Sequence, residues 1–293
     1  MNIHQFQAWR QQISLNPHQY QAPLIMGIIN ITPDSFSDGG HYFSLNQALA
    51  HARKLLAEGA DILDIGGESS RPGAKVISIE EELARVIPLI KQLRQEVDCC
   101  ISIDTTKAEV MQAAVEAGAN IINDITALKD EAALHLVAKL QVPVCLMHMQ
   151  GIPETMQSLP IHYENIIAEI NQFFQNQVKR CLEVGIKEDN IILDPGFGFG
   201  KTIEHNLQLV KDLAQFTQHH LPLMLGVSRK STIGAILNKN VDERAIGGIA
   251  LNVFASLNGV NIIRTHDVVE TKQALTMIDA IMHVNNNLKG NKE

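Results

Sequence analysis

Eight short apolar runs of strand length recur along the chain, and segments with helical periodicity separate them. The runs are 24–30, 61–66, 99–104, 119–124, 142–148, 190–194, 222–228 and 260–266. In intervening segments such as 45–60, 79–97 and 106–119, apolar residues recur three and four positions apart, as on one face of a helix. Alternating strands and helices imply a parallel sheet, and eight such units in roughly 250 residues match a closed (β/α)8 TIM barrel. A doubly wound open sheet stays the alternative, because the number of strands does not establish closure.

A single domain is expected, because no Pro-rich or Ser-rich linker and no low-complexity block divides the 293 residues. We place the barrel at residues 24–288, between an N-terminal extension at 1–23 and a C-terminal tail at 289–293. The first residues lack the basic start and apolar core of a secretory signal. We therefore expect them to form a surface extension.

The balance of charge limits the possible partners. Lys and Arg number 24 and Asp and Glu number 32, and the resulting net charge of -8 argues against binding to nucleic acid. Gly, Asn and Ser interrupt the uncharged stretch 245–263, whose Asn-Gly pair at 258 and 259 predicts a turn, so we expect no membrane segment. The four cysteines show no C-x-x-C spacing, which favours neither a zinc site nor a disulfide framework and fits a reducing cytoplasm.

Polar side chains lie at or just after the carboxyl end of every predicted strand, at the edge where a barrel places its active site. They are Asn30, Asp64 with Glu68, Asp104, Asn123 with Asp124, His148, Asp194, Ser228 with Lys230, and Arg264 with His266. Any single Asp, Asn or Ser here can instead cap the next helix. Lys, Arg and His are poor N-caps, however, and all eight strand ends carry polar groups. Together they predict a polar pocket of mixed charge.

The Gly-rich segment 196–202, GFGFGKT, is not a nucleotide-binding P-loop, because that motif needs Gly where Pro195 stands. Its glycines can let the backbone approach a flat ligand, or they can form a plain flexible loop. His148 lies between two methionines at a strand end, which favours an imidazole of the core or one that supports other site residues. Without HExxH or a close His and carboxylate cluster, we expect no transition-metal site.

Seven motifs, taken in order along successive predicted strands, resemble those of the dihydropteroate synthase family. They are NITPDSFSDGG at 30–40, DIGGESSRPGA at 64–74, SIDT at 102–105, NDI at 123–125, LDPGFGFGK at 193–201, GVSRKS at 226–231 and RTHDV at 264–268. The resemblance runs from about Leu24 to about residue 283, so the first 20 or so residues lie outside it. It implies a pterin-binding barrel that joins 6-hydroxymethyl-7,8-dihydropterin diphosphate to 4-aminobenzoate, with 7,8-dihydropteroate and pyrophosphate as products.

The resemblance assigns pterin recognition to four side chains. Asp104 and Asp194 match the family's pterin carboxylates, Asn123 matches its amide, and Lys230 matches the donor to the acceptor atoms of the pterin. A pterin presents a guanidine-like edge of N–H donors, which a carboxylate recognises through charge-assisted hydrogen bonds.

The resemblance also implies an anion site and a magnesium ion. Arg264 and His266 match the family's diphosphate-binding pair, and Ser70 and Arg71 come from the loop 66–73 after the second predicted strand, which would close over the same region. An Arg fork suits phosphate geometry. Asn30 matches the Mg²⁺ ligand, and its amide oxygen suits a cation that also takes diphosphate oxygens and water.

The second substrate, 4-aminobenzoate, would lie between the first two loops, 30–40 and 66–73. Phe36, Pro72 and Phe199 match the family's apolar contacts, Ser228 matches a contact to the carboxylate, and Asp38 is a further electrostatic contributor. The family breaks the C–O bond first, so positive charge develops on the pterin methylene and electrostatic preorganisation dominates. The residues that we assign to catalysis are Asp104, Lys230, Arg264, His266 and Asp38.

Ser70 departs from the family's usual Thr at that position. Its hydroxyl is kept and a methyl group is lost, which leaves the anion contact and puts in doubt how closely the loop packs on the arylamine. Sulfonamides mimic aminobenzoate in this family, so their binding could differ in strength.

Two other functions stay open at this point. Corrinoid-dependent methyltransferases share a pterin-binding barrel but need no diphosphate site, and a non-catalytic pterin-binding protein would not need every pocket group. The SSRPG and RTHD segments favour the synthase. By analogy with the family we expect a homodimer formed through late helices.

Overall fold

The structure is a computed structural model, and it describes residues 1–15, 19–31, 41–69, 74–151 and 161–284. Eight parallel strands lie side by side in the order β6-β5-β4-β3-β2-β1-β8-β7. Their bounds are β1 (Leu24–Asn30), β2 (Ile62–Gly66), β3 (Cys100–Asp104), β4 (Ile121–Asp124), β5 (Val144–Met147), β6 (Ile191–Asp194), β7 (Met224–Leu225) and β8 (Ile262–Thr265). Each lies within a predicted run.

A parallel bridge between Leu193 in β6 and Leu223 just before β7 joins the two ends of this order. The strands therefore form a ring in which each strand neighbours the ones before and after it in sequence. A doubly wound sheet would reverse its order at a switch point. The (β/α)8 TIM barrel is confirmed, and the open sheet is excluded.

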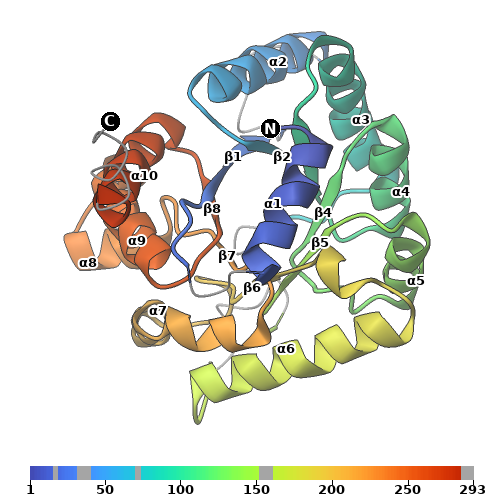
Figure 1. Cartoon of the computed structure of the whole chain (residues 1–293). Helices are drawn as coiled ribbons and strands as arrows, with labels where there is room; N and C mark the ends of the chain where they lie inside the picture. Colours follow the sequence, from blue (N-terminus) through green and yellow to red (C-terminus); the bar gives the residue numbers. More distant parts are fainter. Residues whose placement is uncertain (16–18, 32–40, 70–73, 152–160, 285–293) are drawn as a thin grey trace, which may run out of the picture.

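Helices surround the ring of strands (Figure 1). They are α2 (His41–Ala57), α3 (Ile79–Glu96), α4 (Ala108–Ala117), α5 (Glu131–Leu140), α6 (Ile166–Glu183), α7 (Ile203–Lys211), α8 (Ser231–Leu237), α9 (Ala245–Leu257) and α10 (Val268–Met282). Short 3-10 helices lie at Glu188–Asn190, Leu213–His219 and Val241–Glu243. Several helices begin with a side-chain cap: Ser78 Oγ, for example, accepts from the backbone N–H of Glu81 at 3.1 Å.

Alternation along each strand divides the side chains between two environments. In β3, Ile101 and Ile103 belong to the main core between strands and helices. The intervening residues point the other way, into the barrel, because successive side chains of a strand face opposite sides. Cys100 lies there in an apolar cluster, whereas Ser102 and Asp104 follow in the direction of the strand. The barrel interior thus turns polar toward the carboxyl ends of its strands.

The structure corrects the expectation that residues 1–23 form a surface extension. Residues Ile3–Leu15 form α1, which lies across the end of the barrel at which the strands begin (Figure 1). Phe6, Trp9 and Ile13 are buried there against the apolar ends of the strands. The spacing of these residues by three and four positions was the sequence signal for an amphipathic helix. Burial of that apolar face keeps α1 on the barrel.

The uncharged stretch 245–263 forms α9, a turn and the start of β8, as predicted. Gly259 adopts φ +87° in that turn, a conformation that glycine allows at no steric cost. Within the described part of the chain, none of the helices has the length and apolar character needed to cross a membrane.

Candidate active site

Arg264 lies at the centre of a group of buried polar side chains in the mouth of the barrel. Its Nε donates to Asp64 Oδ2 at 2.6 Å, and its Nη2 donates to Asp104 Oδ2 at 2.7 Å. Asn123 Nδ2 also donates to Asp64 Oδ2, at 3.1 Å. Strands β2, β3, β4 and β8 therefore bring three predicted site residues together, Arg264, Asp104 and Asn123.

Asp64 has no role assigned to it from the sequence, although it lies near the carboxyl end of the predicted strand 61–66. It is fully buried, and register places it opposite Ser102 and one layer deeper than Asp104. A buried carboxylate needs a cation or hydrogen-bond donors. Arg264 and Asn123 supply both, so Asp64 orients the guanidinium and the amide that the sequence had singled out.

Burial dominates the electrostatics of this group. It raises the pKa of Asp104 to about 7, against the opposing effect of the Arg264 guanidinium, while the Asp64 charge adds to the increase. For Arg264, burial lowers the pKa, but the Asp64 and Asp104 charges outweigh burial and raise it overall. The guanidinium thus stays charged, and Asp104 can change its protonation state near neutral pH.

Asp194 and Lys230 form a second part of the mouth, next to the Gly-rich loop. Asp194 Oδ1 accepts from the Gly196 backbone N–H at 2.7 Å. Lys230 Nζ donates to the Phe197 carbonyl oxygen and lies 4.3 Å from the centroid of the Phe199 ring. Burial lowers the pKa of Lys230 to about 7, opposed by the Asp194 charge, and burial raises the pKa of Asp194, opposed mainly by Lys230.

His266 and Ser228 meet where β7 and β8 end. Ser228 Oγ lies 3.1 Å from His266 Nδ1 and accepts from the His266 backbone N–H at 3.2 Å. Between Ser228 and Lys230, Arg229 adopts φ +59°, and its Nη2 pairs with Asp267 at 2.6 Å. This ion pair fixes a residue in a conformation that non-glycine residues rarely adopt, and the turn places Ser228 and Lys230 on the barrel mouth.

Asn30 ends β1 at the same edge. It pairs in register with Gly66, which pairs in turn with Asp104. The Asn30 Oδ1 atom lies 3.7 Å from the point where a Cβ atom on Gly66 would be. Asn30 and Asp104 therefore flank Gly66 at the strand ends.

Five predicted site residues lie outside the described residues. They are Phe36, Asp38, Ser70, Arg71 and Pro72. Their predicted roles stay predictions.

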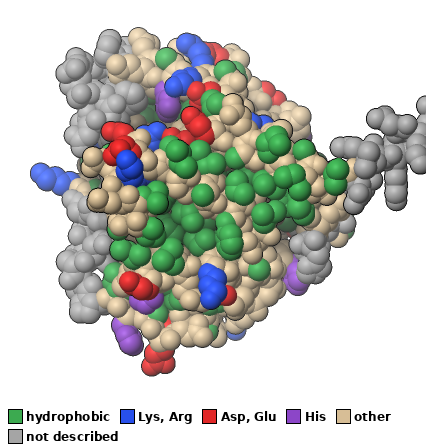
Figure 2. All heavy atoms as spheres, turned by 90° about the vertical axis from the view of Figure 1, so that its left-hand side faces the viewer, with side chains coloured by type: hydrophobic (Ala, Val, Ile, Leu, Met, Phe, Trp, Pro, Cys, Tyr) green, Lys and Arg blue, Asp and Glu red, His purple; other side chains and the backbone are tan. Residues whose placement is uncertain are grey.

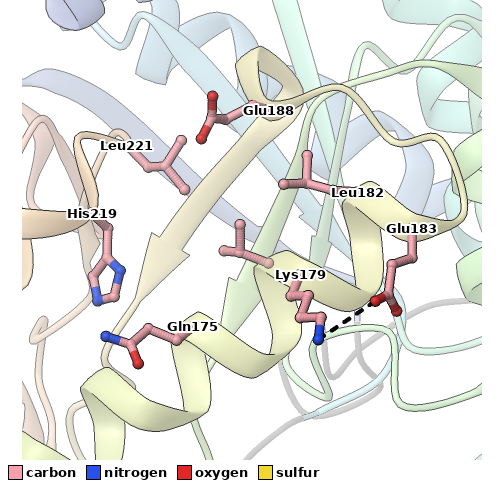
Figure 3. Close-up of a pocket in the computed structure, with 8 residues that line it drawn as sticks. Gln175, Lys179, Leu182, Glu183, Glu188, His219 and Leu221 are labelled. Atoms are coloured by element: carbon pink, nitrogen blue, oxygen red, sulfur yellow. Dashed lines mark ion pairs between the residues drawn. The ribbon is translucent and has the colours of Figure 1, made fainter.

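Two further observations concern possible binding sites elsewhere. Among the described residues, no group of three or more His, Cys, Asp or Glu residues could hold a metal ion. A hollow of about 580 Å³ lies on the outside of the barrel between α6 and the 3-10 helix Leu213–His219 (Figure 3). Its charged pair, Lys179 and Glu183, is exposed, and Leu182 is 43% exposed. Glu188 and Leu221, which also line it, precede β6 and β7, so this hollow lies toward the ends at which the strands begin and not at the barrel mouth.

Comparison with known proteins matches the chain over almost its whole length. A family model described as pterin binding enzyme matches residues 26–266. Dihydropteroate synthase of Escherichia coli (strain K12) is 48% identical over 265 residues, which cover 90% of this chain and 94% of the relative.

Two solved structures are similar in fold as well as in sequence. Yersinia pestis dihydropteroate synthase in complex with a sulfonamide drug superposes with a TM-score of 0.84 at 48% identity, covering 89% of this chain and 94% of that one. Xanthomonas albilineans dihydropteroate synthase with 4-aminobenzoic acid gives a TM-score of 0.84 at 44% identity, covering 89% and 93%.

Proposed function

The chain belongs to the pterin-binding enzymes, among the dihydropteroate synthases, and from this premise we propose how its residues divide the work of the reaction. It condenses 6-hydroxymethyl-7,8-dihydropterin diphosphate with 4-aminobenzoate, and 7,8-dihydropteroate and pyrophosphate leave. The observation that carries this function in the structure is the convergence of Asp104, Asn123 and Arg264 on buried Asp64 at the carboxyl ends of the strands.

Asp104, Asn123, Asp194 and Lys230 recognise the pterin. Arg264 engages Oδ2 of Asp104, and Gly196 engages Oδ1 of Asp194, so each carboxylate has a second oxygen to accept from the N–H edge of the pterin. The Lys230 ammonium can donate to the pterin's acceptor atoms. All four side chains come from strand ends or from the turns that directly follow them, where the barrel holds them rigidly.

Arg264 and His266 hold the diphosphate. The guanidinium carries five N–H donors, and the two ion pairs with Asp64 and Asp104 leave others for phosphate oxygens. Those same pairs fix the plane of the guanidinium, so it meets the leaving group with little reorganisation. Ser70 and Arg71 are proposed to contact the same diphosphate.

Asn30 is the proposed Mg²⁺ ligand. Its amide oxygen is a hard donor at the barrel mouth, which fits a metal that takes one or two protein oxygens together with substrate phosphates and water. When bound, the metal supplies positive charge beside the diphosphate oxygens.

The reaction needs no protein nucleophile. The C–O bond of the pterin methylene breaks, and its electron pair leaves with pyrophosphate, whose charge Arg264 and His266 stabilise. Asp104 and Asp194 face the cationic pterin that remains. The aminobenzoate nitrogen then forms the C–N bond and releases a proton. Phe199 and Ser228, with Phe36, Asp38 and Pro72 from the first two loops, are proposed to surround this second substrate.

A turnover assay tests the function. The purified protein, given the dihydropterin diphosphate, 4-aminobenzoate and Mg²⁺, is expected to form 7,8-dihydropteroate and pyrophosphate in equal amounts. Asp194→Asn is expected to lower this rate, whereas Asp189→Asn, a change at an exposed position away from the mouth, leaves it unchanged. A folded protein that forms no dihydropteroate, or that transfers a methyl group from a folate instead, would contradict the proposal.

A homodimer is proposed from the apolar face over α8, α9 and α10. Hydrophobic side chains gather across this side of the molecule (Figure 2). Ile246 is 82% exposed, and Phe254, Leu257, Met277 and Ile281 are also exposed. Large contiguous apolar patches are uncommon on monomers and mark interfaces. We expect analytical ultracentrifugation to show a dimer that Ile246→Asp dissociates, and a monomeric parent protein would refute the assignment.

A cytoplasmic location is also proposed. It is supported by the four cysteines, which are all free thiols buried in the structure.

A further inference from the structure

Lys201 is a buried cation to which the reaction assigns no role. Its side chain follows the Gly-rich loop 196–200, and the residue is only 3% exposed. Its Nζ contacts four acceptors: the carbonyl oxygens of Gly196 at 2.8 Å, Phe199 at 3.1 Å and His148 at 3.3 Å, and His148 Nδ1 at 3.1 Å. A buried ammonium is costly unless it is fully hydrogen-bonded, so these contacts organise the backbone around it.

The loop is shaped to close around this ammonium. Gly196, Gly198 and Gly200 all adopt positive φ, at +70°, +82° and +59°. A Cβ atom on Gly196 would lie 1.9 Å from the His148 carbonyl oxygen, and one on Gly200 would lie 2.3 Å from that of Gln150. The chain therefore packs its backbone directly on the segment after β5, and Lys201 links the two.

His148 is suited to accept from Lys201. Burial, together with the nearby Lys201 charge, lowers the pKa of His148 to about 2, so the imidazole is neutral. Its ring packs edge-on against Phe173, with centroids 5.0 Å apart. Tyr163, whose ring also lies beside His148, donates from its hydroxyl to the Gly200 carbonyl oxygen at 3.1 Å. Hydrogen bonds therefore hold the loop at both of its ends, from Lys201 to Gly196 and from Tyr163 to Gly200.

Three groups of the pterin subsite depend on this loop. The Gly196 N–H donates to Asp194, the Phe197 carbonyl accepts from Lys230, and the Phe199 ring lies against the Lys230 ammonium. Lys201 contacts the carbonyl oxygens of Gly196 and Phe199, which are the first and last of these three loop residues. Displacement of the loop would therefore move two groups together: the Gly196 N–H that donates to Asp194, and the Phe197 carbonyl oxygen that accepts from Lys230.

We propose that Lys201 is a positioning residue of the pterin subsite, which clamps the 196–199 loop onto His148 so that Asp194 and Lys230 meet the pterin. It touches no substrate in this role. The proposal rests on the proposed function, which assigns the pterin subsite to these residues. Pterin binding can nevertheless be measured without turnover.

The Lys201 charge has a second consequence for Asp194. Lys230, Lys201 and Arg264 all oppose the effect of burial on the pKa of Asp194, which burial raises. His148, which faces Lys201 from the segment after β5, is neutral. Burial lowers the pKa of Lys201 itself to about 7; the Asp194 charge opposes this decrease and Lys230 adds to it. Loss of the Lys201 charge therefore raises the pKa of Asp194 and moves the acid limit of pterin binding to higher pH.

Calorimetric titration of 6-hydroxymethylpterin into variants tests the proposal. We expect Lys201→Met to weaken pterin binding at least tenfold and to shift the acid midpoint of the affinity upward. Lys201→Gln keeps donors without the charge, so it is expected to weaken binding less and to shift the midpoint as Lys201→Met does. Lys211→Met, the same change at an exposed position of α7, is the matched control and leaves both unchanged.

The fraction of folded protein is measured by circular dichroism for each variant. If Lys201→Met does not fold, the titration of Lys201→Gln decides. A purely structural lysine would lower thermal stability while the folded fraction kept the parent affinity and midpoint, and that result would overturn the proposal. A parent protein that binds pterin without any turnover would refute the proposed function and leave the Lys201 prediction standing.

Discussion

Replacement of Arg264 by methionine is the most informative perturbation of the barrel mouth. Arg264 bonds two carboxylates at 2.6 and 2.7 Å, of which Asp64 is fully buried and Asp104 nearly so. Methionine replaces the apolar stem of the arginine side chain and carries no charge, so the change removes the cation and keeps the packing of the stem. Two carboxylates then face each other without a counter-charge in a region of low dielectric.

The expected cost follows from this geometry. Breaking a buried ion pair by removing one partner destabilises a protein by about 3 to 5 kcal/mol, because the remaining charge stays buried and uncompensated. Asn123 still donates to Asp64, which favours the lower end of this range.

The pH dependence has a definite sign. In the parent protein the pKa of Asp104 is raised from 3.8 to about 7, so the stability contributed by its protonation is complete at low pH and is lost as the pH rises through about 7. Removing Arg264 raises this pKa further, because the guanidinium opposes the increase. Protonation of Asp104 then offsets part of the loss in acid. The deficit of the variant is therefore expected to grow with pH.

Urea denaturation followed by circular dichroism at about pH 5.5 and about pH 8.5 measures this deficit. Arg53→Met, which breaks the exposed pair of Arg53 with Glu96, is the matched control and is expected to change stability little at either pH. A deficit for Arg264→Met that is equal at both pH values, or no larger than that of the control, would refute the reasoning.

Three further predictions concern pterin recognition, the packing of α1 against the barrel, and the order in which substrates bind. Asp194→Asn is expected to weaken pterin binding at least tenfold in calorimetry, since a hydrogen bond to a charged group contributes about 1.5 to 3 kcal/mol; unchanged affinity would remove Asp194 from the pterin site. Phe6→Ala opens a cavity under α1 and is expected to cost about 3 to 5 kcal/mol in urea denaturation with kcat/KM unchanged; a small cost would show that α1 packs loosely. 4-Aminobenzoate is expected to bind appreciably only with Mg²⁺ and pyrophosphate present, and Arg71→Ala is expected to weaken this coupling. The affinity for 4-aminobenzoate is measured by titration of the parent protein without and with Mg²⁺ and pyrophosphate, and of Arg71→Ala with both; equal affinity in these three titrations would contradict the coupling.

Periodicity predicted the barrel because it depends on local patterns. Each predicted strand contains an observed one, although 222–228 contains only Met224–Leu225 as a strand, since Pro222 and Gly226 limit regular pairing there. The packing of α1 could not be predicted in the same way, because apolar residues at positions 6, 9 and 13 do not indicate which distant surface they cover.

The strand-end rule predicted that Asp104, Asn123, Asp194, Lys230 and Arg264 lie at one edge of the barrel, since parallel strands present their carboxyl ends there. This rule does not predict which side chains form ion pairs or hydrogen bonds with one another. Arg264 pairs with Asp64, which lies 200 positions earlier in the sequence, and the motif LDPGFGFGK contains Lys201 without indicating that its side chain contacts His148. Such pairings depend on barrel closure and register, which no local pattern specifies.

A crystal structure of the protein with a pterin and pyrophosphate tests the central claim most directly. The account predicts that the N–H edge of the pterin lies within hydrogen-bond distance of Asp194 and Asp104, with Lys230 at its acceptor atoms. Pyrophosphate is predicted to contact Arg264 and His266. A pterin bound away from the strand ends, for example in the hollow between α6 and Leu213–His219, would contradict the account.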